Sequence, residues 1–133
     1  MIGNAIVDTD VASFIFKRDT RAALYEPHLR HRISALSFQT VAEMEQWSAV
    51  RSWGNRRIRE LEEFFTTFVI VESDPALCKI WGRIRAQAVQ QGRPIETADA
   101  WIAATALRYR APLVTHNRSH FQQVADLIVI SMA

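Results

Sequence analysis

Short apolar segments alternate along the chain with longer stretches in which apolar residues recur every three or four positions. The apolar segments are residues 5–7, 33–36, 68–71, 113–115 and 127–130, which have the length of buried β-strands. The first of them is apolar at every position, as is typical of a central parallel strand covered on both faces. Helical spacing covers residues 11–17, 19–29, 40–53, 56–67, 75–91 and 97–109. This alternation predicts a three-layer α/β/α domain with a mostly parallel central sheet.

The last helical stretch, residues 97–109, carries one acid that needs an explanation. Its small side chains make it slim enough to lie close to a sheet: Ala100, Ala103, Ala104 and Ala106. Asp99 lies in the first turn, where an acid gains well under about 1 kcal/mol from the helix dipole at an exposed site. Glu96 already supplies negative charge there. We therefore expect Asp99 to point into a cleft at the head of the alanine face.

Asp8 directly follows the first predicted strand, at the carboxyl edge of the sheet, where open α/β sheets bind ligands. The alternative is that Asp8 only caps the next helix, since aspartate is favoured at N-caps. Asp10 fits that cap better because it lies directly before Val11, where the predicted helix begins. Asp8 is then left for a functional role.

Glu43 also has two interpretations. Thr40 and Glu43 have the spacing of a capping box, in which the glutamate side chain bonds to the backbone of the cap residue. The same position places Glu43 in the first turn of a helix that follows the second strand, so it can face the same cleft as Asp8.

Three carboxylates that meet at one sheet edge repel one another unless a cation neutralises them. Ligation by oxygen alone suits Mg²⁺ or Mn²⁺, which share coordination with substrate phosphates. Such a metal activates water and stabilises charge on phosphoryl oxygens. Asp8, Glu43 and Asp99 therefore predict metal-assisted hydrolysis of phosphodiester bonds.

Four motifs in register resemble those of the PIN-domain nucleases, and among them the VapC-type toxins of bacterial toxin–antitoxin pairs. The motifs are I-V-D-T-D-V at 6–11, T-V-A-E-M at 40–44, D-A-W-I-A-A-T-A-L at 99–107 and L-V-T-H-N-R-S-H-F at 113–121. Their order and spacing match the family pattern from Ile6 to Ile130.

The resemblance implies that Asp8, Glu43 and Asp99 hold Mg²⁺ or Mn²⁺ for endoribonuclease cleavage of RNA. Thr115 and Asn117 are then expected to shape the floor of the site. The resemblance also implies a homodimer that is inhibited by a small VapB-type antitoxin, whose tail fills a groove. Three alternatives remain for the helices around the aromatic residues Trp47, Trp53 and Phe64. These residues form the antitoxin groove, the dimer face or ordinary core.

The chain departs from the family pattern in its last motif. Many relatives carry a fourth acid at the place of Asn117 or His120, and neither residue is a carboxylate here. Asn117 can still orient a water molecule, and His120 can contact phosphate or a metal, or lie on the surface. The number of metal ions, one or two, stays open.

Composition bounds the remaining possibilities. With 133 residues, 49% of them hydrophobic, residues 1–133 are expected to form one domain. Among the 16 basic residues only Lys17 and Lys79 are lysines; the arginine bias suits phosphate recognition, and equally an arginine-rich genome. The single cysteine, Cys78, is expected in the core. No apolar run approaches the ~20 residues of a membrane-spanning helix, so we expect a cytoplasmic protein without membrane contact.

Two other functions compete with this interpretation. Asp8 and Asp10 resemble the D-x-D start of haloacid-dehalogenase-type phosphatases, as nucleophile and general acid. That chemistry also needs a later lysine and a downstream acid pair, yet Lys79 is the only lysine after Lys17 and no acid pair follows Asp99. The other alternative, motivated by the missing fourth acid, is a PIN module that binds nucleic acid or an antitoxin without cutting.

Overall fold

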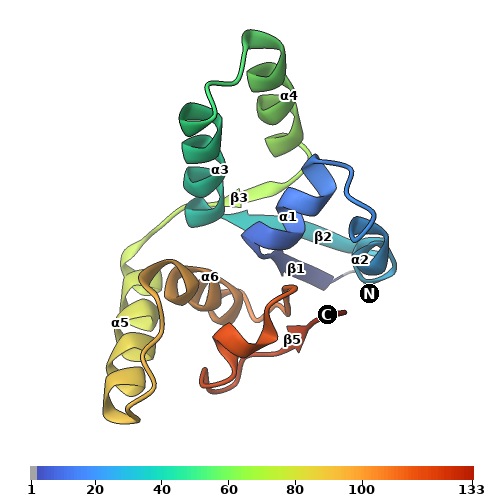
Figure 1. The fold of residues 1–133 in the computed structure, drawn as a ribbon. Coiled ribbons are helices and arrows are strands. Elements are labelled where there is room, and N and C mark those ends of the chain that lie inside the picture. The colour runs from blue at the N-terminus through green and yellow to red at the C-terminus, as the bar shows by residue number, and fades with distance from the viewer. Residues whose placement is uncertain (1–2) are drawn as a thin grey trace.

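A computed structural model describes residues 3–133 and contains a five-stranded parallel sheet (Figure 1). The strand order is β3-β2-β1-β4-β5, with β1 in the middle. The strands are β1 (Gly3–Val7), β2 (Arg32–Ser37), β3 (Val69–Val71), β4 (Leu113–Val114) and β5 (Val129–Ile130). Every neighbouring pair is parallel, so each connection has to cross a face of the sheet.

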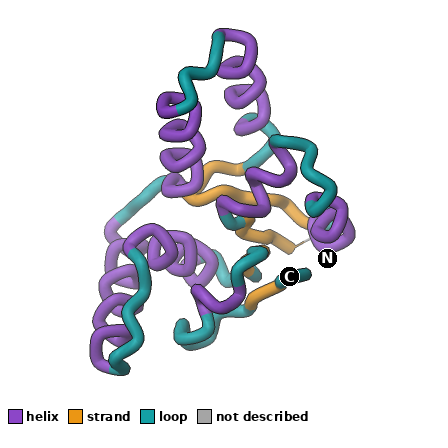
Figure 2. Tube along the Cα trace, viewed as in Figure 1, coloured by secondary structure: helices purple, strands orange, loops and turns teal. Residues whose placement is uncertain are grey.

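Residues 3–133 contain six α-helices and one short 3₁₀ helix. They are α1 (Thr9–Phe16), α2 (Ala22–Leu29), α3 (Phe38–Val50), α4 (Asn55–Phe65), α5 (Pro75–Gln90), α6 (Thr97–Arg108) and η1 (Arg118–Phe121). Helices flank the strands on both sides, as the purple and orange segments of Figure 2 show. The predicted α/β/α fold with a parallel sheet is confirmed.

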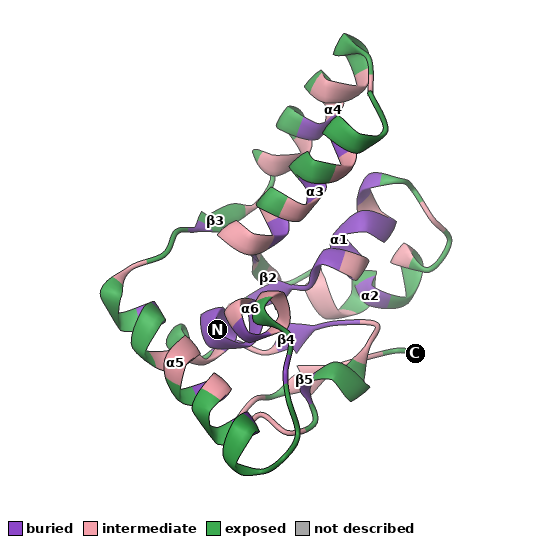
Figure 3. Cartoon of the chain, turned by 60° about the vertical axis from the view of Figure 1, so that its left-hand side comes forward, coloured by how far each residue is buried: buried purple, intermediate pink, exposed green. Residues whose placement is uncertain are grey.

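Two apolar cores lie on opposite faces of the sheet, because alternate strand residues point to opposite sides. Ile6 and Leu113 pack with α5 and α6 in one core, whereas Val7 and Val114 pack with α1 to α4 in the other. Figure 3 shows buried residues gathered where α6 and α1 meet the central strands. The alanines of α6 are buried, as their small size predicts: Ala100, Ala103, Ala104 and Ala106.

The start of α1 differs from the prediction. The helix begins at Thr9, and Asp8 is its N-cap, with an extended backbone and a side chain that accepts a hydrogen bond from the Thr9 N–H. The expectation that Asp10 caps a helix beginning at Val11 is therefore wrong. Asp10 lies in the first turn, which frees its side chain for a different role.

The predicted capping box at Thr40 and Glu43 is also wrong, because α3 begins two residues earlier than expected. Ser37 is the N-cap, and its hydroxyl accepts a hydrogen bond from the backbone N–H of Gln39 over 3.1 Å. The hydroxyl of Thr40 instead lies 2.9 Å from the hydroxyl of Thr9. Glu43 consequently lies beyond the first turn of the helix, too far along it to bond to the backbone N–H of the N-cap residue.

Of the two predictions that the sequence made for helix α5, one is correct and one is wrong. Asp74 caps it as expected, accepting a hydrogen bond from the N–H of Leu77 over 2.7 Å, and Pro75 takes the first helical position. Cys78, however, is exposed, because the helix turns Leu77, rather than its neighbour, toward the core. Within residues 3–133, no helix has the combination of length and apolarity needed to cross a membrane.

Candidate active site

An open cleft of about 350 Å³ lies at the carboxyl ends of the central strands. It is lined by Asp8, Thr9, Asp10, Ser13, Phe14, Glu43, Trp47, Asp99, Asn117 and His120. The three acids predicted from the sequence therefore reach one cleft from three different elements: the end of β1, helix α3 and helix α6. Asn117 and His120 reach it from the segment around η1.

Asp8 is the most constrained of these acids. Only 7% of the residue is exposed, and both carboxylate oxygens accept hydrogen bonds. The Thr9 N–H donates to Oδ1 over 2.7 Å, and the Thr115 hydroxyl donates to Oδ2 over 2.7 Å. Burial, followed by the charge of Asp10, raises the pKa of Asp8 to about 7, against the opposing effect of the two hydrogen bonds.

Asp10 is a cleft residue to which the nuclease interpretation of the sequence gave no role. Its Oδ1 accepts a hydrogen bond from the Val11 N–H over 2.7 Å, and its Oδ2 accepts one from the His116 N–H over 3.1 Å. Burial also raises the pKa of Asp10. The D-x-D spacing at the end of a buried strand was the available signal, since both acids then stay near the same sheet edge.

Asp99 faces the residues of the last motif. His120 Nδ1 lies 3.1 Å from Asp99 Oδ2, and His120 Nε2 lies 2.9 Å from the side-chain nitrogen of Asn117. The pKa of Asp99 is raised, chiefly by burial, while nearby His120 lowers it. The two positions without a carboxylate thus form a polar bridge to one of the three acids.

Glu43 enters the cleft from the middle of α3. Its Oε1 accepts a hydrogen bond from the side-chain amide of Gln39, one turn earlier, over 3.1 Å. The charge of Glu43 contributes to the raised pKa of Asp99, so the two carboxylates are electrostatic neighbours. Trp47, one turn later on α3, forms part of the wall.

The donor set of the cleft suits a hard divalent cation. Asp8, Glu43 and Asp99 offer carboxylate oxygens, and burial and like charge raise the pKa of both aspartates, so a cation there would relieve an unfavourable negative charge. Among residues 3–133, no three His, Cys, Asp or Glu side chains are arranged as a ready-made metal site. An open site of this kind matches Mg²⁺, which keeps several waters and binds through few carboxylates.

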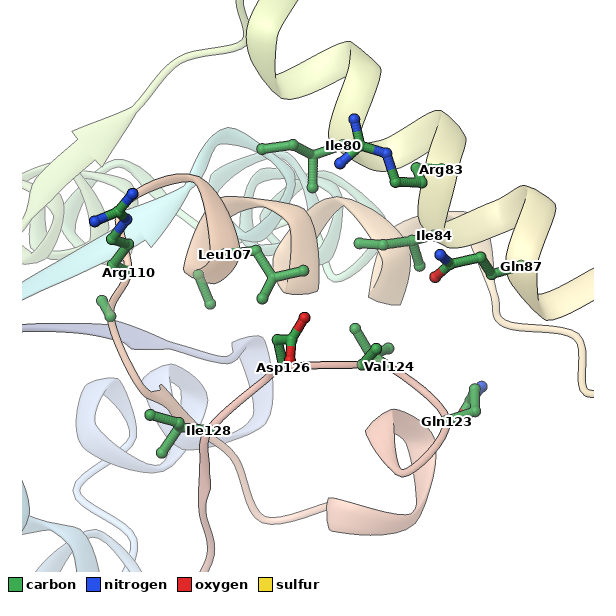
Figure 4. Close-up of a pocket in the computed structure, with 13 residues that line it drawn as sticks. Ile80, Arg83, Ile84, Gln87, Leu107, Arg110, Gln123, Val124, Asp126 and Ile128 are labelled. Atoms are coloured by element: carbon green, nitrogen blue, oxygen red, sulfur yellow. The ribbon is translucent and has the colours of Figure 1, made fainter.

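A second cavity of about 430 Å³ lies away from these acids, between α5, α6 and the segment before β5. Ile84, Leu107 and Val124 face it from these three segments, with Arg83 and Asp126 also in its lining (Figure 4). Its lining is largely aliphatic and shares no residue with the acidic cleft. The chemistry of the molecule is therefore concentrated in the smaller cleft.

Residues 5–127 match the model of the PIN domain family. The chain belongs to the PIN domain family. This result confirms the resemblance seen in the four motifs. It also rejects the haloacid-dehalogenase interpretation of Asp8 and Asp10, which belongs to a different family.

The chain is similar to named PIN proteins over most of its length. Ribonuclease VapC1 of Haemophilus influenzae (strain R2866) is 28% identical over 124 residues, which cover 92% of each chain. The solved structure of VapBC-1 from nontypeable Haemophilus influenzae has a TM-score of 0.80 at 28% identity, covering 98% of both chains. VapBC2 from Rickettsia felis, bound to a DNA fragment from its promoter, has a TM-score of 0.84 at 22% identity over 98% of both chains and supports the fold.

Proposed function

We propose that this PIN-domain protein is a Mg²⁺- or Mn²⁺-dependent endoribonuclease that acts as the toxin of a toxin–antitoxin pair. The observation that carries the proposal is the meeting of Asp8, Glu43 and Asp99 in one cleft of a PIN fold. The similarity to ribonuclease VapC1 supports RNA as the substrate. VapC ribonucleases with a PIN domain are generally metal-dependent, which agrees with the oxygen-rich cleft.

The three acids have different parts in this mechanism. Asp8 is buried and held at both oxygens, so it would be a fixed ligand. Glu43 and Asp99 approach from α3 and α6 and would complete the protein's share of the coordination. When bound, the metal ion would supply an activated water and charge stabilisation at the phosphoryl group. The walls of the cleft orient the scissile phosphate, which contributes by positioning.

Asn117 and His120 act at the position where many relatives carry a fourth acid. The Asn117 side chain is held from two sides, by His120 Nε2 at 2.9 Å and by the Ser119 hydroxyl, which donates to Oδ1 over 3.0 Å. A fixed amide can orient an attacking water without adding charge. His120 is exposed and lies beside Asp99, where its ring can contact a phosphate oxygen of the substrate.

The proposed partner is a VapB-type antitoxin, and the proposed assembly is a homodimer. The similarity to VapBC-1, solved as a VapBC structure, supports the antitoxin. Helices α3 and α4 form a hairpin that projects from the sheet (Figure 1). Its half-buried aromatic residues Trp47, Trp53 and Phe64 offer an apolar surface for an antitoxin tail. Part of their surface is core, since the Phe64 and Phe16 ring centroids lie 5.3 Å apart.

The decisive experiment is cleavage of structured RNA by the purified protein with Mn²⁺, with Mg²⁺ and with EDTA. The variants are Asp8→Asn and Asp99→Asn, with Asp126→Asn as the matched control, because Asp126 is exposed and lies outside the cleft. We expect cutting only with metal, and its loss in the two cleft variants but not in the control. Cutting in EDTA, or full activity of Asp99→Asn, would reject the metal mechanism.

The same experiment separates the nuclease from a non-catalytic binding module. A folded, metal-loaded protein that cuts none of the RNAs but still binds RNA or its antitoxin would favour the module. Relief of growth arrest by the short gene next to this one, when the two are expressed together, tests the toxin role independently of the choice of RNA.

A further inference from the structure

Tyr25 anchors helix α2 in the core, with Ala22 and Leu29 of the same helix packed beside it. Tyr25 is the only buried residue of that helix, and its relative exposure is 0%. Its hydroxyl has three polar neighbours: His116 Nδ1 at 2.5 Å, the carbonyl oxygen of Thr115 at 3.3 Å and the backbone N–H of Met132 at 3.1 Å. One phenol group therefore joins α2, the end of β4 and the segment after β5.

The peptide group between Thr115 and His116 connects Tyr25 to the acids. Its carbonyl oxygen faces the Tyr25 hydroxyl, while its N–H donates to Asp10 Oδ2 over 3.1 Å. The side chain of Thr115, one bond away, donates to Asp8 Oδ2. Asp8 and Asp10 are thus both hydrogen-bonded to residues 115 and 116. Tyr25 contacts the carbonyl oxygen of the peptide group that joins these two residues.

The ring of His116 is held in place, and so is its backbone N–H. It packs edge-on against Phe14, with ring centroids 5.2 Å apart, and against Tyr25 at 5.7 Å. Its Nδ1 points at the Tyr25 hydroxyl. The conformation of the residue that donates to Asp10 is therefore set by two aromatic contacts and one hydrogen bond.

We propose that Tyr25 and His116 are positioning residues for the acidic cleft, and that His116 carries a hydrogen on Nδ1. A phenol has one hydrogen to donate and two lone pairs. All three contacts of Tyr25 are satisfied only if its hydrogen goes to the Thr115 carbonyl and its oxygen accepts from both Met132 and His116. Nδ1 of His116 is then the donor. In the opposite tautomer, the carbonyl of Thr115 loses its partner.

This arrangement links the phenol, the peptide group and the carboxylate of Asp10 into one chain of hydrogen bonds. Donation to the Thr115 carbonyl polarises the peptide and strengthens the bond from the His116 N–H to Asp10. It also fixes the plane of the peptide, and with it the direction in which the Thr115 hydroxyl meets Asp8. Tyr25 therefore acts on the acids without touching substrate or metal.

The first test measures the tautomer directly and needs no nuclease activity. In ¹⁵N-labelled protein, long-range ¹H–¹⁵N correlation distinguishes a ring nitrogen that carries hydrogen from one that does not. We expect the hydrogen of His116 on Nδ1 in the wild-type protein. A neutral ring with its hydrogen on Nε2 would overturn the proposal.

The second test uses Tyr25→Phe, which removes only the hydroxyl, with Tyr109→Phe as the control. Tyr109 is the only other tyrosine and is exposed at the end of α6. Partners of metal ligands typically change metal affinity or activity by about ten- to a hundredfold. We expect Tyr25→Phe to lower kcat and the Mn²⁺ affinity measured by calorimetry about tenfold, with KM nearly unchanged. Wild-type values in Tyr25→Phe would overturn the proposal.

A third pair of variants keeps the test decisive if Tyr25→Phe folds poorly. In His116→Asn the side-chain amide nitrogen can take the place of Nδ1 and still donate to Tyr25, whereas His116→Gln presents its amide one atom further out. We expect Asn to keep most of the Mn²⁺ affinity and activity and Gln to lose both. Equal behaviour of the two variants would contradict the assigned hydrogen bond.

The activity measurements rest on the proposed nuclease function, but the tautomer and the Mn²⁺ affinity do not. If the wild-type protein cuts no RNA while His116 carries its hydrogen on Nδ1 and Tyr25→Phe weakens Mn²⁺ binding, the proposed function fails and the positioning role stands. If RNA is cut, while His116 carries its hydrogen on Nε2 and Tyr25→Phe binds Mn²⁺ as tightly as the wild-type protein, the proposed function stands and the positioning role fails.

Discussion

The Thr115 hydroxyl donates to Asp8 Oδ2 over 2.7 Å, although the two residues are 107 positions apart in the chain. The contact is possible because β1 and β4 are neighbours in the sheet and end at the same edge. The same hydroxyl accepts a hydrogen bond from the Asn117 N–H over 3.0 Å. Thr115 therefore joins the most buried acid to the backbone of the last motif.

Replacing Thr115 with valine should impair the site while keeping its shape. Thr115→Val removes the hydroxyl from a fully buried side chain and leaves Asp8 Oδ2 and the Asn117 N–H without this partner. We expect activity to fall roughly ten- to a hundredfold and the free energy of unfolding to fall by about 1–3 kcal/mol. Thr115→Ser, which keeps the hydroxyl, is the control. Cleavage rates and chemical denaturation measure the two effects, and a fully active Thr115→Val would refute the assignment.

The stability of the metal-free protein should depend on pH through Asp8. Its pKa is raised from 3.8 to about 7 in the folded protein, so between these values the folded state holds a proton that the unfolded state has lost. The free energy of unfolding therefore falls as pH rises through this range, by up to about 1.4 kcal/mol per pH unit. The raised pKa values of Asp10 and Asp99 act in the same direction.

Asp8→Asn tests this sign, because the amide cannot ionise. In EDTA at pH 7 we expect the variant to melt at a higher temperature than the wild-type protein, and its stability to change less between pH 5 and pH 7. Thermal denaturation in chelating buffer measures both quantities. A wild-type protein that becomes more stable as pH rises over this interval would contradict a pKa of Asp8 that burial has raised.

The sheet, its helices and the meeting of Asp8, Glu43 and Asp99 in one cleft could be predicted from the sequence, because they follow from periodicity and from the common edge of parallel strands. The starts of α1 and α3 could not. Ser37 and Thr40 are both good cap residues, and local sequence does not decide between them. Tertiary packing does, since Thr40 pairs with Thr9 of another helix.

The details of the site depended on contacts between distant segments. Asp10 resembled a cap, and only the return of the chain at His116, 106 residues later, shows what holds its second carboxylate oxygen. Cys78 was misplaced because an apolar helix offers several possible buried faces. Glu43 lines the cleft as expected, but it lies beyond the first turn of α3, and its side chain has no capping role.

Glu43 should be essential for cleavage, whereas its neighbour Glu45 should not be. Both are on α3, but Glu43 lines the cleft and Glu45 is exposed on another side. We expect Glu43→Gln to lose most of its RNA cleavage and to bind Mn²⁺ roughly tenfold more weakly, while Glu45→Gln keeps both. Side-by-side cleavage assays and calorimetry with Mn²⁺ separate the two. Equal losses in both variants would point to a general effect of charge on α3 rather than to a ligand.

Asn117→Asp should strengthen metal binding, since it adds a carboxylate at the position where the resemblance to PIN-domain nucleases implies a fourth acid. Asn117 lines the cleft with Asp8 and Asp99, so the new negative charge would face the same space.

The metal-free protein should lose stability, because another acid joins a cluster in which Asp8 and Asp99 already have raised pKa values. The metal-loaded protein should regain it, since a ligand that binds the folded state stabilises that state. Gln122→Glu is the matched control, because it makes the same change from amide to carboxylate on an exposed side chain of the same segment, outside the lining of the cleft. Mn²⁺ calorimetry and melting curves with and without EDTA measure the difference, and an unchanged Mn²⁺ affinity in Asn117→Asp would show that this position does not face the metal.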